Sequence, residues 1–282
     1  MPRNHNFIGS DAVQLSARHG VNSNERRHFI MENKNPIQVA DRLFQTLEVL
    51  AESGPTGLME LSSKLSLNKS TVHRILNSLI YMGYVKQNPE TTKYSLTFKI
   101  WELANQLLTQ NDIVDIARPH LKELVSKCGE TVHLVQVDGR KAVYIDKVES
   151  YTNSVRLVSK VGKSIPLYCS GVGKALLAEM DLDNAREIWD NSDIQELTPH
   201  TITDFSEMQK HLKQVHTQGY AIDDEENELG VRCIAACIKD YKGKPKYAFS
   251  ISAPVNRMSD ERIAELARDV LDTQKKLEAE WN

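Results

Sequence analysis

The segment from Lys69 to about Met82 separates apolar and polar side chains onto two faces of a helix. Its apolar residues follow the i, i+3, i+4, i+7 spacing of one buried stripe, which comprises Val72, Ile75, Leu76 and Leu79. Polar residues repeat that spacing on the opposite side, namely Ser70, His73, Arg74 and Asn77. Asn68 stands where a side chain caps the first turn, and Leu67 can pack back onto Val72. The segment therefore predicts a capped helix with one face in a small core and a hydrophilic face left exposed.

The flanking residues predict a compact module around this helix. Breaker residues at 53–55 (Ser-Gly-Pro) and Gly83 end the helical patterns, and Asn88 and Pro89 mark a turn. In chain order the expected elements are helices over 36–53, 58–65 and 69–82, and strands over 84–87 and 93–96. This order predicts a winged helix-turn-helix domain over residues 35–97.

The charge of this module differs from that of the whole chain. The net charge of the chain is -3. Between residues 64 and 93, however, the only acidic residue is Glu90, and the basic residues are Lys64, Lys69, Arg74, Lys86 and Lys93. Such a local basic patch suits the phosphates of double-stranded DNA.

A recognition helix in the major groove predicts two kinds of contact. His73, Arg74 and Asn77 are expected to reach base edges. The DNA backbone is expected to contact Lys69, Ser70, Thr71, Lys86 and Lys93. Two alternatives remain open, because any single residue here is as well explained by a solvated helix face, and winged helices also serve as protein-interaction modules.

The rest of the chain predicts a linker helix and a second domain. Residues 98–112 are expected to form the linker helix, and its apolar positions call for a partner surface such as a dimer mate: Ile100, Leu103, Leu107 and Leu108. Residues 113–282 mix alternating and helical patterns, which predicts an α+β sensor domain. Strands are expected over 131–137, 142–148, 155–161, 231–238 and 246–252, and helices over 113–128, 171–180, 183–189, 205–218 and 260–281.

Composition excludes some classes of protein. The polar residues 1–34 predict a disordered tail, within which Met31 is a candidate start. No stretch is apolar enough for a membrane span or a secretory signal, so we expect a cytoplasmic protein without a membrane partner. The chain has four scattered cysteines, too few for a disulfide framework: Cys128, Cys169, Cys233 and Cys237.

Long motifs in both halves of the chain resemble the IclR family of bacterial transcription regulators. The N-terminal motifs are LMELSSKLSLNKSTVHRILNSLIYMGYV and KYSLTFKIWELA, and the C-terminal ones are IPLYCSGVGKALLA, GYAIDDEENELGVRCIAACI and FSISAP. The resemblance extends from about Ile37 to the C-terminus. It implies a GAF-like effector domain, a homodimer or homotetramer, and repression or activation of transcription controlled by a small organic acid.

The same resemblance implies an effector site. The backbone N–H groups of Gly171 and Val172 would hold the acid, and the side chains of Asp223, Cys233, Ser250 and Ser252 would complete the pocket. Glycines at a helix start let backbone donors approach a carboxylate closely. Asp223 would repel that carboxylate, so it needs a ligand hydroxyl or a shared proton, which favours 2-oxo acids and sugar acids. Residues 224–226 are expected in a solvated loop.

Two other functions are compatible with parts of the sequence. An enzyme acting on a 2-oxo acid could use His133, Asp146 and Lys174, but no nucleophile motif surrounds any serine. A zinc-responsive regulator could use Cys169 and Cys233, whereas Cys233 and Cys237 stand about 13 Å apart on an extended strand, too far to share one zinc ion. We therefore expect no catalytic residue, metal site or cofactor. The identity of the acid, the operator and the direction of regulation remain open.

Overall fold

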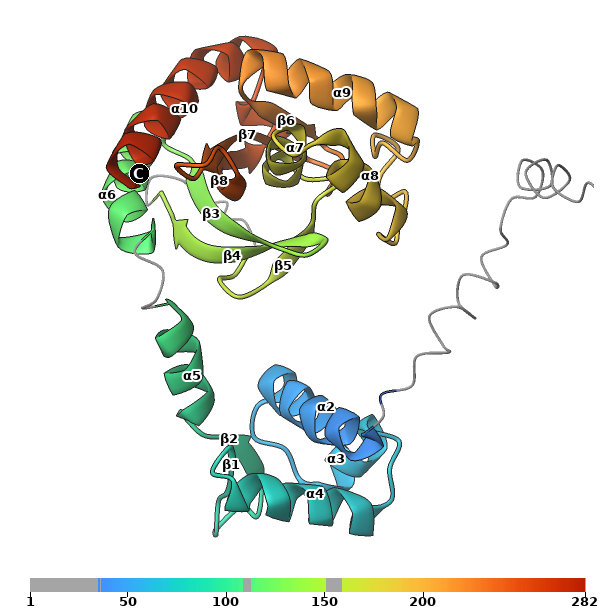
Figure 1. The fold of residues 1–282 in the computed structure, drawn as a ribbon. Helices are drawn as coiled ribbons and strands as arrows, with labels where there is room; N and C mark the ends of the chain where they lie inside the picture. The colour runs from blue at the N-terminus through green and yellow to red at the C-terminus, as the bar shows by residue number, and fades with distance from the viewer. Residues whose placement is uncertain (1–34, 36, 109–112, 151–158, 282) are drawn as a thin grey trace, which may run out of the picture. The chain divides into compact units, whose positions relative to one another are not determined.

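A computed structural model describes residues 35, 37–108, 113–150 and 159–281, and two compact units divide the chain at Ala104 and Asn105 (Figure 1). The expected tail over 1–34 lies outside the described residues, as does most of the strand expected over 155–161. Residues 159–161 are described and do not form a strand. The division between the units falls inside α5 (Lys99–Leu108), within the predicted linker helix.

The first unit is a winged helix-turn-helix, as predicted. Its elements are α2 (Gln38–Ser53), α3 (Leu58–Lys64), α4 (Lys69–Tyr81), β1 (Val85–Gln87) and β2 (Tyr94–Leu96). The two strands pair in antiparallel fashion, and Thr56 exchanges two backbone hydrogen bonds of 2.9 Å with Tyr94 of β2. The predicted apolar stripe of α4 is buried against Leu50 of α2 and Leu61 of α3. This packing leaves the opposite face of α4 free.

The second unit is built on a six-stranded antiparallel sheet with the order β5-β4-β3-β8-β7-β6. The strands are β3 (Thr131–Asp138), β4 (Lys141–Val148), β5 (Ser164–Pro166), β6 (Ala221–Asp224), β7 (Val231–Lys239) and β8 (Pro245–Pro254). The helices are α6 (Ile113–Cys128), α7 (Gly171–Ala178), α8 (Leu182–Asp190), α9 (Phe205–Gln218), η1 (Val255–Arg257) and α10 (Asp260–Trp281). The predicted α+β class is confirmed, although β5 and β6 were not expected.

Helices cover both faces of this sheet. Helices α6 and α10 pack on one face, and α7, α8 and α9 form the layer on the other (Figure 1). Because side chains alternate along a strand, Ile234 and Ala236 of β7 face the first layer, whereas Ala235 and Cys237 face the second. The sheet is therefore buried on both sides, and any ligand site must lie where a helix layer leaves space.

Helix α7 lies unusually close to the chain around it. A side-chain carbon at Gly173 would overlap the backbone of Leu167, so only glycine fits there. The whole helix from Gly171 to Leu177 is buried, including Lys174. The predicted glycine-rich helix start is thus a tight contact between α7 and the segment that leads into it.

Of the helices in the described ranges, none has the length and apolar character needed to cross a bilayer.

Candidate DNA-binding and effector sites

The polar face of α4 is a rigid, solvent-facing surface. The Asn68 carboxamide oxygen accepts a hydrogen bond of 2.9 Å from the backbone N–H of Thr71, which caps the helix as expected. The predicted contact residues of this helix are exposed, apart from the half-buried Thr71: Lys69, Ser70, His73, Arg74 and Asn77. This places every base-reading candidate on one free face.

The hairpin beside α4 holds the two remaining basic candidates. Lys86 lies on β1, and Lys93 immediately precedes β2; both are exposed. The turn between them is fixed because the Asn88 side-chain oxygen accepts the N–H groups of Glu90 at 2.8 Å and Thr91 at 3.0 Å. The Lys99 ammonium donates to the carbonyl of Met82 at 2.6 Å, which ties the end of α4 to the start of α5. The geometry is that of a basic wing beside a recognition helix.

The second unit contains a cavity of about 320 Å³ on the α7 side of the sheet. Three of the six predicted effector residues line it: Asp223, Cys233 and Ser252. Ser250 does not line it, but its hydroxyl oxygen is 3.4 Å from that of Ser252, so the two hydroxyls share a face as predicted. Sequence reasoning missed other lining residues, among them Tyr144, Ser159, Lys163, Asn227 and Glu228.

The N-terminus of α7 lies next to Asp223 of β6. Gly171 and Val172 do not line the cavity, but a side-chain carbon at Gly171 would lie 3.5 Å from the backbone nitrogen of Asp223. The Ser170 hydroxyl accepts the N–H of Gly173 at 3.2 Å. Within the part of the chain that the structure describes, the N–H groups of Gly171 and Val172 have no protein acceptor. Two buried donors at a helix N-terminus remain available for an anion.

Asp223 is buried and holds the loop that follows β6. One of its carboxyl oxygens accepts the backbone N–H groups of Glu226 at 2.9 Å and Asn227 at 3.4 Å. Burial raises the pKa of Asp223 to about 7, against the opposing effect of the nearby Lys174 ammonium. Near neutral pH this carboxyl group therefore exists in both protonation states.

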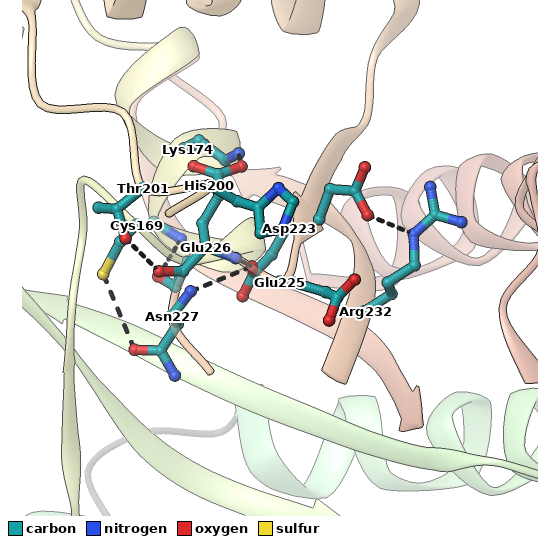
Figure 2. Close-up of polar contacts among 12 residues, drawn as sticks. Cys169, Lys174, His200, Thr201, Asp223, Glu225, Glu226, Asn227 and Arg232 are labelled. Atoms are coloured by element: carbon teal, nitrogen blue, oxygen red, sulfur yellow. Dashed lines mark hydrogen bonds and ion pairs between the residues drawn. The ribbon is translucent and has the colours of Figure 1, made fainter. Parts of the chain in front are cut away.

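A buried ion pair between Lys174 and Glu226 braces the same loop (Figure 2). Lys174 is 0% exposed and Glu226 is 4% exposed. The hydroxyl groups of Thr198 and Thr201 donate to the carbonyls of Glu225 and Glu226, each at 2.6 Å. The expectation of a solvated loop over 224–226 is therefore wrong for Glu226, because Lys174 draws its carboxylate into the core.

His133 forms part of the cavity wall and is held by two hydroxyl groups. Its Nε2 atom lies 2.6 Å from the Ser159 hydroxyl oxygen, and its Nδ1 atom lies 3.3 Å from that of Ser252. Burial lowers the pKa of His133 to about 3, so the imidazole is neutral at physiological pH. The residue acts as a hydrogen-bonded link between two cavity hydroxyls.

The structure does not assemble the residues of the two alternative functions. Asp146 pairs with Arg118 of α6 at 2.7 Å, whereas Lys174 pairs with Glu226 beneath the other face of the sheet. Burial raises the pKa values of the Cys169, Cys233 and Cys237 thiols, which disfavours the thiolate form that binds zinc. In the described ranges no three His, Cys, Asp or Glu side chains converge as a metal site would require.

Comparison with known proteins agrees with both halves of the structure. Residues 39–89 match the IclR helix-turn-helix domain, and residues 105–279 match the bacterial transcriptional regulator IclR C-terminal domain. The chain is 37% identical over 250 residues to the HTH-type transcriptional regulator KdgR of Escherichia coli, covering 88% of this chain and 95% of that protein. It is 32% identical over 244 residues to the transcriptional repressor IclR of the same species, covering 86% and 89%.

A solved structure shows the same architecture. The crystal structure of Thermotoga maritima IclR aligns with a TM-score of 0.74 at 29% identity, over 86% of this chain and 98% of that one. This likeness bears out the predicted combination of a winged helix-turn-helix and a GAF-like second domain. Both Escherichia coli relatives are named as regulators of transcription, not as enzymes. The chain belongs to the IclR family, whose members are DNA-binding transcriptional regulators.

Proposed function

We propose that this regulator is a repressor whose operator affinity is controlled by a small organic acid, a 2-oxo acid or sugar acid, bound beside Asp223. The observation that carries the proposal is the pair of unused N–H groups of Gly171 and Val172 next to a buried carboxyl group and a cavity of about 320 Å³. Buried donors without partners are costly to a folded protein unless a ligand or water satisfies them. A carboxylate at the start of α7 would satisfy both.

The chemistry of the neighbouring side chains favours an acid with an adjacent hydroxyl group. The buried Asp223 can accept a hydrogen bond from a hydroxyl group, or share its own proton with the ligand. Ser250 and Ser252 present two further hydroxyls on one strand. A hydrated 2-oxo acid or a sugar acid offers the matching groups, whereas an alkyl acid would leave these polar atoms unsatisfied.

On the DNA side, α4 is proposed to enter the major groove of the operator. In this arrangement Arg74, His73 and Asn77 contact base edges. The hydroxyl and ammonium groups near the phosphates are those of Lys69, Ser70, Thr71, Lys86 and Lys93. All of these except Thr71 are exposed, which supports the assignment.

A homodimer is proposed to place two such helices on one near-palindromic operator. Helix α5 and the residue before it support this because they expose large apolar side chains: Phe98, just before the helix, is 81% exposed, and Trp101 and Leu103 of α5 are 66% and 49% exposed. A second copy of the chain would bury these residues. Of the other apolar positions expected to need a partner, Ile100 is half-buried, and the side chains of Leu107 and Leu108 lie outside the described residues.

The effector assignment can be tested by ligand-induced stabilisation. Thermal unfolding of the purified protein would be followed against a panel of 2-oxo acids, sugar acids and alkyl acids. A ligand that binds only the folded state at 100 times its Kd stabilises it by about 2.7 kcal/mol. The proposal expects stabilisation by at least one oxo or hydroxy acid and its loss in Gly171→Val. Stabilisation that is unchanged in Gly171→Val would exclude the α7 N-terminus as the acid site.

A further inference from the structure

The polar face of α4 continues beyond the residues that are proposed to contact DNA. Tyr81 follows Asn77 by four positions and Arg74 by seven, so it lies on the same face of the helix. It is 93% exposed, more than any other large apolar or aromatic side chain that the structure describes. We infer, on the basis of the proposed docking of α4, that Tyr81 and Lys99 form a further contact site for the DNA backbone at the C-terminal end of this helix.

The length of the polar face places Tyr81 at the edge of the major groove. At the ~1.5 Å rise per residue of an α-helix, the eleven positions from Ser70 to Tyr81 span about 16 Å. The major groove is about 12 Å wide and winds around the duplex, so a short helix cannot follow it over this length. The N-terminal residues of a recognition helix contact the base edges. Tyr81 is the last residue of α4, and its hydroxyl group would therefore meet the sugar–phosphate backbone.

The charge at this end of α4 suits a phosphate group. The helix contains no acidic residue, but the carbonyl groups at a helix C-terminus carry a partial negative charge that repels DNA. Two side chains from the segment after the hairpin satisfy these carbonyls. The Lys99 ammonium donates to the carbonyl of Met82 at 2.6 Å, and the Thr97 hydroxyl donates to that of Gly83 at the same distance. Lys99 therefore offsets the negative end of the helix and adds a full positive charge beside Tyr81.

The Lys99 ammonium is held in place and still has hydrogens to donate. It lies 4.7 Å from the centre of the Tyr84 ring, which is a cation–π contact. Among the described residues no carboxylate pairs with it. An ammonium group has three hydrogens, and the Met82 carbonyl takes one of them. Lysine and tyrosine side chains both serve as phosphate contacts in protein–DNA complexes, so the two residues can bind the backbone together.

The test measures affinity for two duplexes by fluorescence anisotropy over a range of salt concentrations. One duplex is selected in vitro by the wild type, and the other is a random sequence of the same length. Tyr81→Phe should weaken binding to both about tenfold, the size expected for a hydrogen bond to a charged group. The salt dependence should stay unchanged, because no charge is removed. Tyr241→Phe is the matched control, since this tyrosine is also exposed, at 75%, but lies in the second unit.

The charged half of the site has its own test. Lys99→Met should weaken binding to both duplexes, and the slope of log affinity against log salt concentration should become shallower by about 1. Lys99→Arg keeps the charge and should retain the wild-type slope. Lys99→Met also loses the bond to Met82, so its stability is followed by urea unfolding. Tyr81→Phe loses no hydrogen bond within the described structure and tests the site even if Lys99→Met is unstable.

Three results would overturn the inference. Tyr81→Phe that binds both duplexes as tightly as Tyr241→Phe would show that the hydroxyl group makes no contact. Weaker binding to the selected duplex alone would make Tyr81 a base-reading residue, and a shift towards monomer in sedimentation experiments would make it a subunit contact. The proposed docking of α4 would survive each of these results if Arg74→Ala relaxes selectivity. Wild-type protein that binds the selected duplex no better than the random one would overturn the docking and the inference together.

Discussion

The ammonium of Lys174 and the carboxylate of Glu226 form an ion pair inside the second unit, where both side chains are buried. Lys174 belongs to α7, and Glu226 belongs to the loop that Asp223 also holds through a backbone N–H. The pair therefore joins the two structural elements from which the proposed acid site is built. A substitution that breaks the ion pair should therefore also disturb the geometry of that site.

The first prediction concerns the stability that this pair provides. Glu226→Gln leaves the Lys174 ammonium buried without a counter-ion, and breaking a buried pair in this way costs about 3 to 5 kcal/mol. The free energy of unfolding, measured with urea, should fall by this order. Glu196→Gln serves as a control: because Glu196 is exposed, this substitution should change the free energy of unfolding little. Much of the loss should be restored in the double variant Lys174→Met and Glu226→Leu; a double variant as unstable as Glu226→Gln would show that the pair is not the cause.

The second prediction concerns pH. Because burial raises the pKa of Asp223 to about 7, its carboxyl group is mostly neutral at pH 6 and mostly ionised at pH 8. An anionic effector should bind better when the Asp223 carboxyl group is neutral. The affinity for the effector should therefore fall as the pH rises above 7, with a limiting slope of about tenfold per pH unit. Calorimetry on the wild type and on Asp223→Asn would check this. The variant should show a flatter profile between pH 6 and 8, and an equally steep one would assign the dependence to another group.

The same carboxyl group makes a prediction for folding. Its pKa rises from 3.8 in the unfolded chain to about 7 in the folded protein, so the folded state holds the proton more tightly. Its contribution to the free energy of unfolding should therefore be fully present below about pH 4 and decline as the pH rises towards 7. Comparing urea unfolding of the wild type and Asp223→Asn across this range isolates the contribution. If the wild type instead gained stability relative to Asp223→Asn as the pH rises, the assigned direction of the pH dependence would be wrong.

The third prediction separates base contacts from phosphate contacts. Arg74→Ala should cost about 1 to 3 kcal/mol of operator binding free energy and relax sequence selectivity. Lys86→Ala should weaken binding to all sequences alike, and the slope of log affinity against log salt concentration should become shallower by about 1, the value for one phosphate contact. Fluorescence anisotropy over a range of salt concentrations, on specific and random duplexes, would distinguish them. Equal loss on both duplexes for Arg74→Ala would remove it from the base-reading set.

The fourth prediction tests the role of α5 in assembly. Trp101→Glu places a charge on an exposed apolar face, so it should shift the protein towards monomer in sedimentation experiments and weaken operator binding. Glu102→Gln is a neighbouring change that should leave the association state as it is. An unaltered sedimentation profile for Trp101→Glu would place the subunit interface elsewhere.

The first unit could be predicted in detail because its signals are local. The stripe of α4, the cap at Asn68 and the turn at Asn88 each depend on residues a few positions apart, and all three occur in the structure. In the second unit, the long helices and strands were predicted for the same reason. The three-residue β5 and the four-residue β6 were missed, since runs this short carry too little alternation to distinguish a strand from a loop.

The lining of the cavity in the second unit was predicted only in part, because it depends on contacts between distant segments. Asp223, Cys233 and Ser252 were named through resemblance, and they meet at one cavity. Nothing local to Glu226 indicates burial; its partner Lys174 lies 52 positions earlier in the chain, and in sequence Glu226 is the last residue of an acidic run. Lys163 likewise reaches the cavity from the turn that leads into β5, a strand whose pairing with β4 the sequence did not predict.

The measurement that tests the account most directly is operator binding with and without a bound acid. A duplex selected in vitro from random sequences would be titrated with the wild type and with Gly171→Val, in the presence and absence of a saturating concentration of the acid that most stabilises the wild type in thermal unfolding. The account predicts a 5- to 150-fold change in wild-type affinity, which corresponds to a coupling of about 1 to 3 kcal/mol, and no change in Gly171→Val, whose affinity without acid should equal that of the wild type. Wild-type protein that binds the acid by calorimetry, yet holds its operator with the same affinity in both conditions, would contradict the central claim.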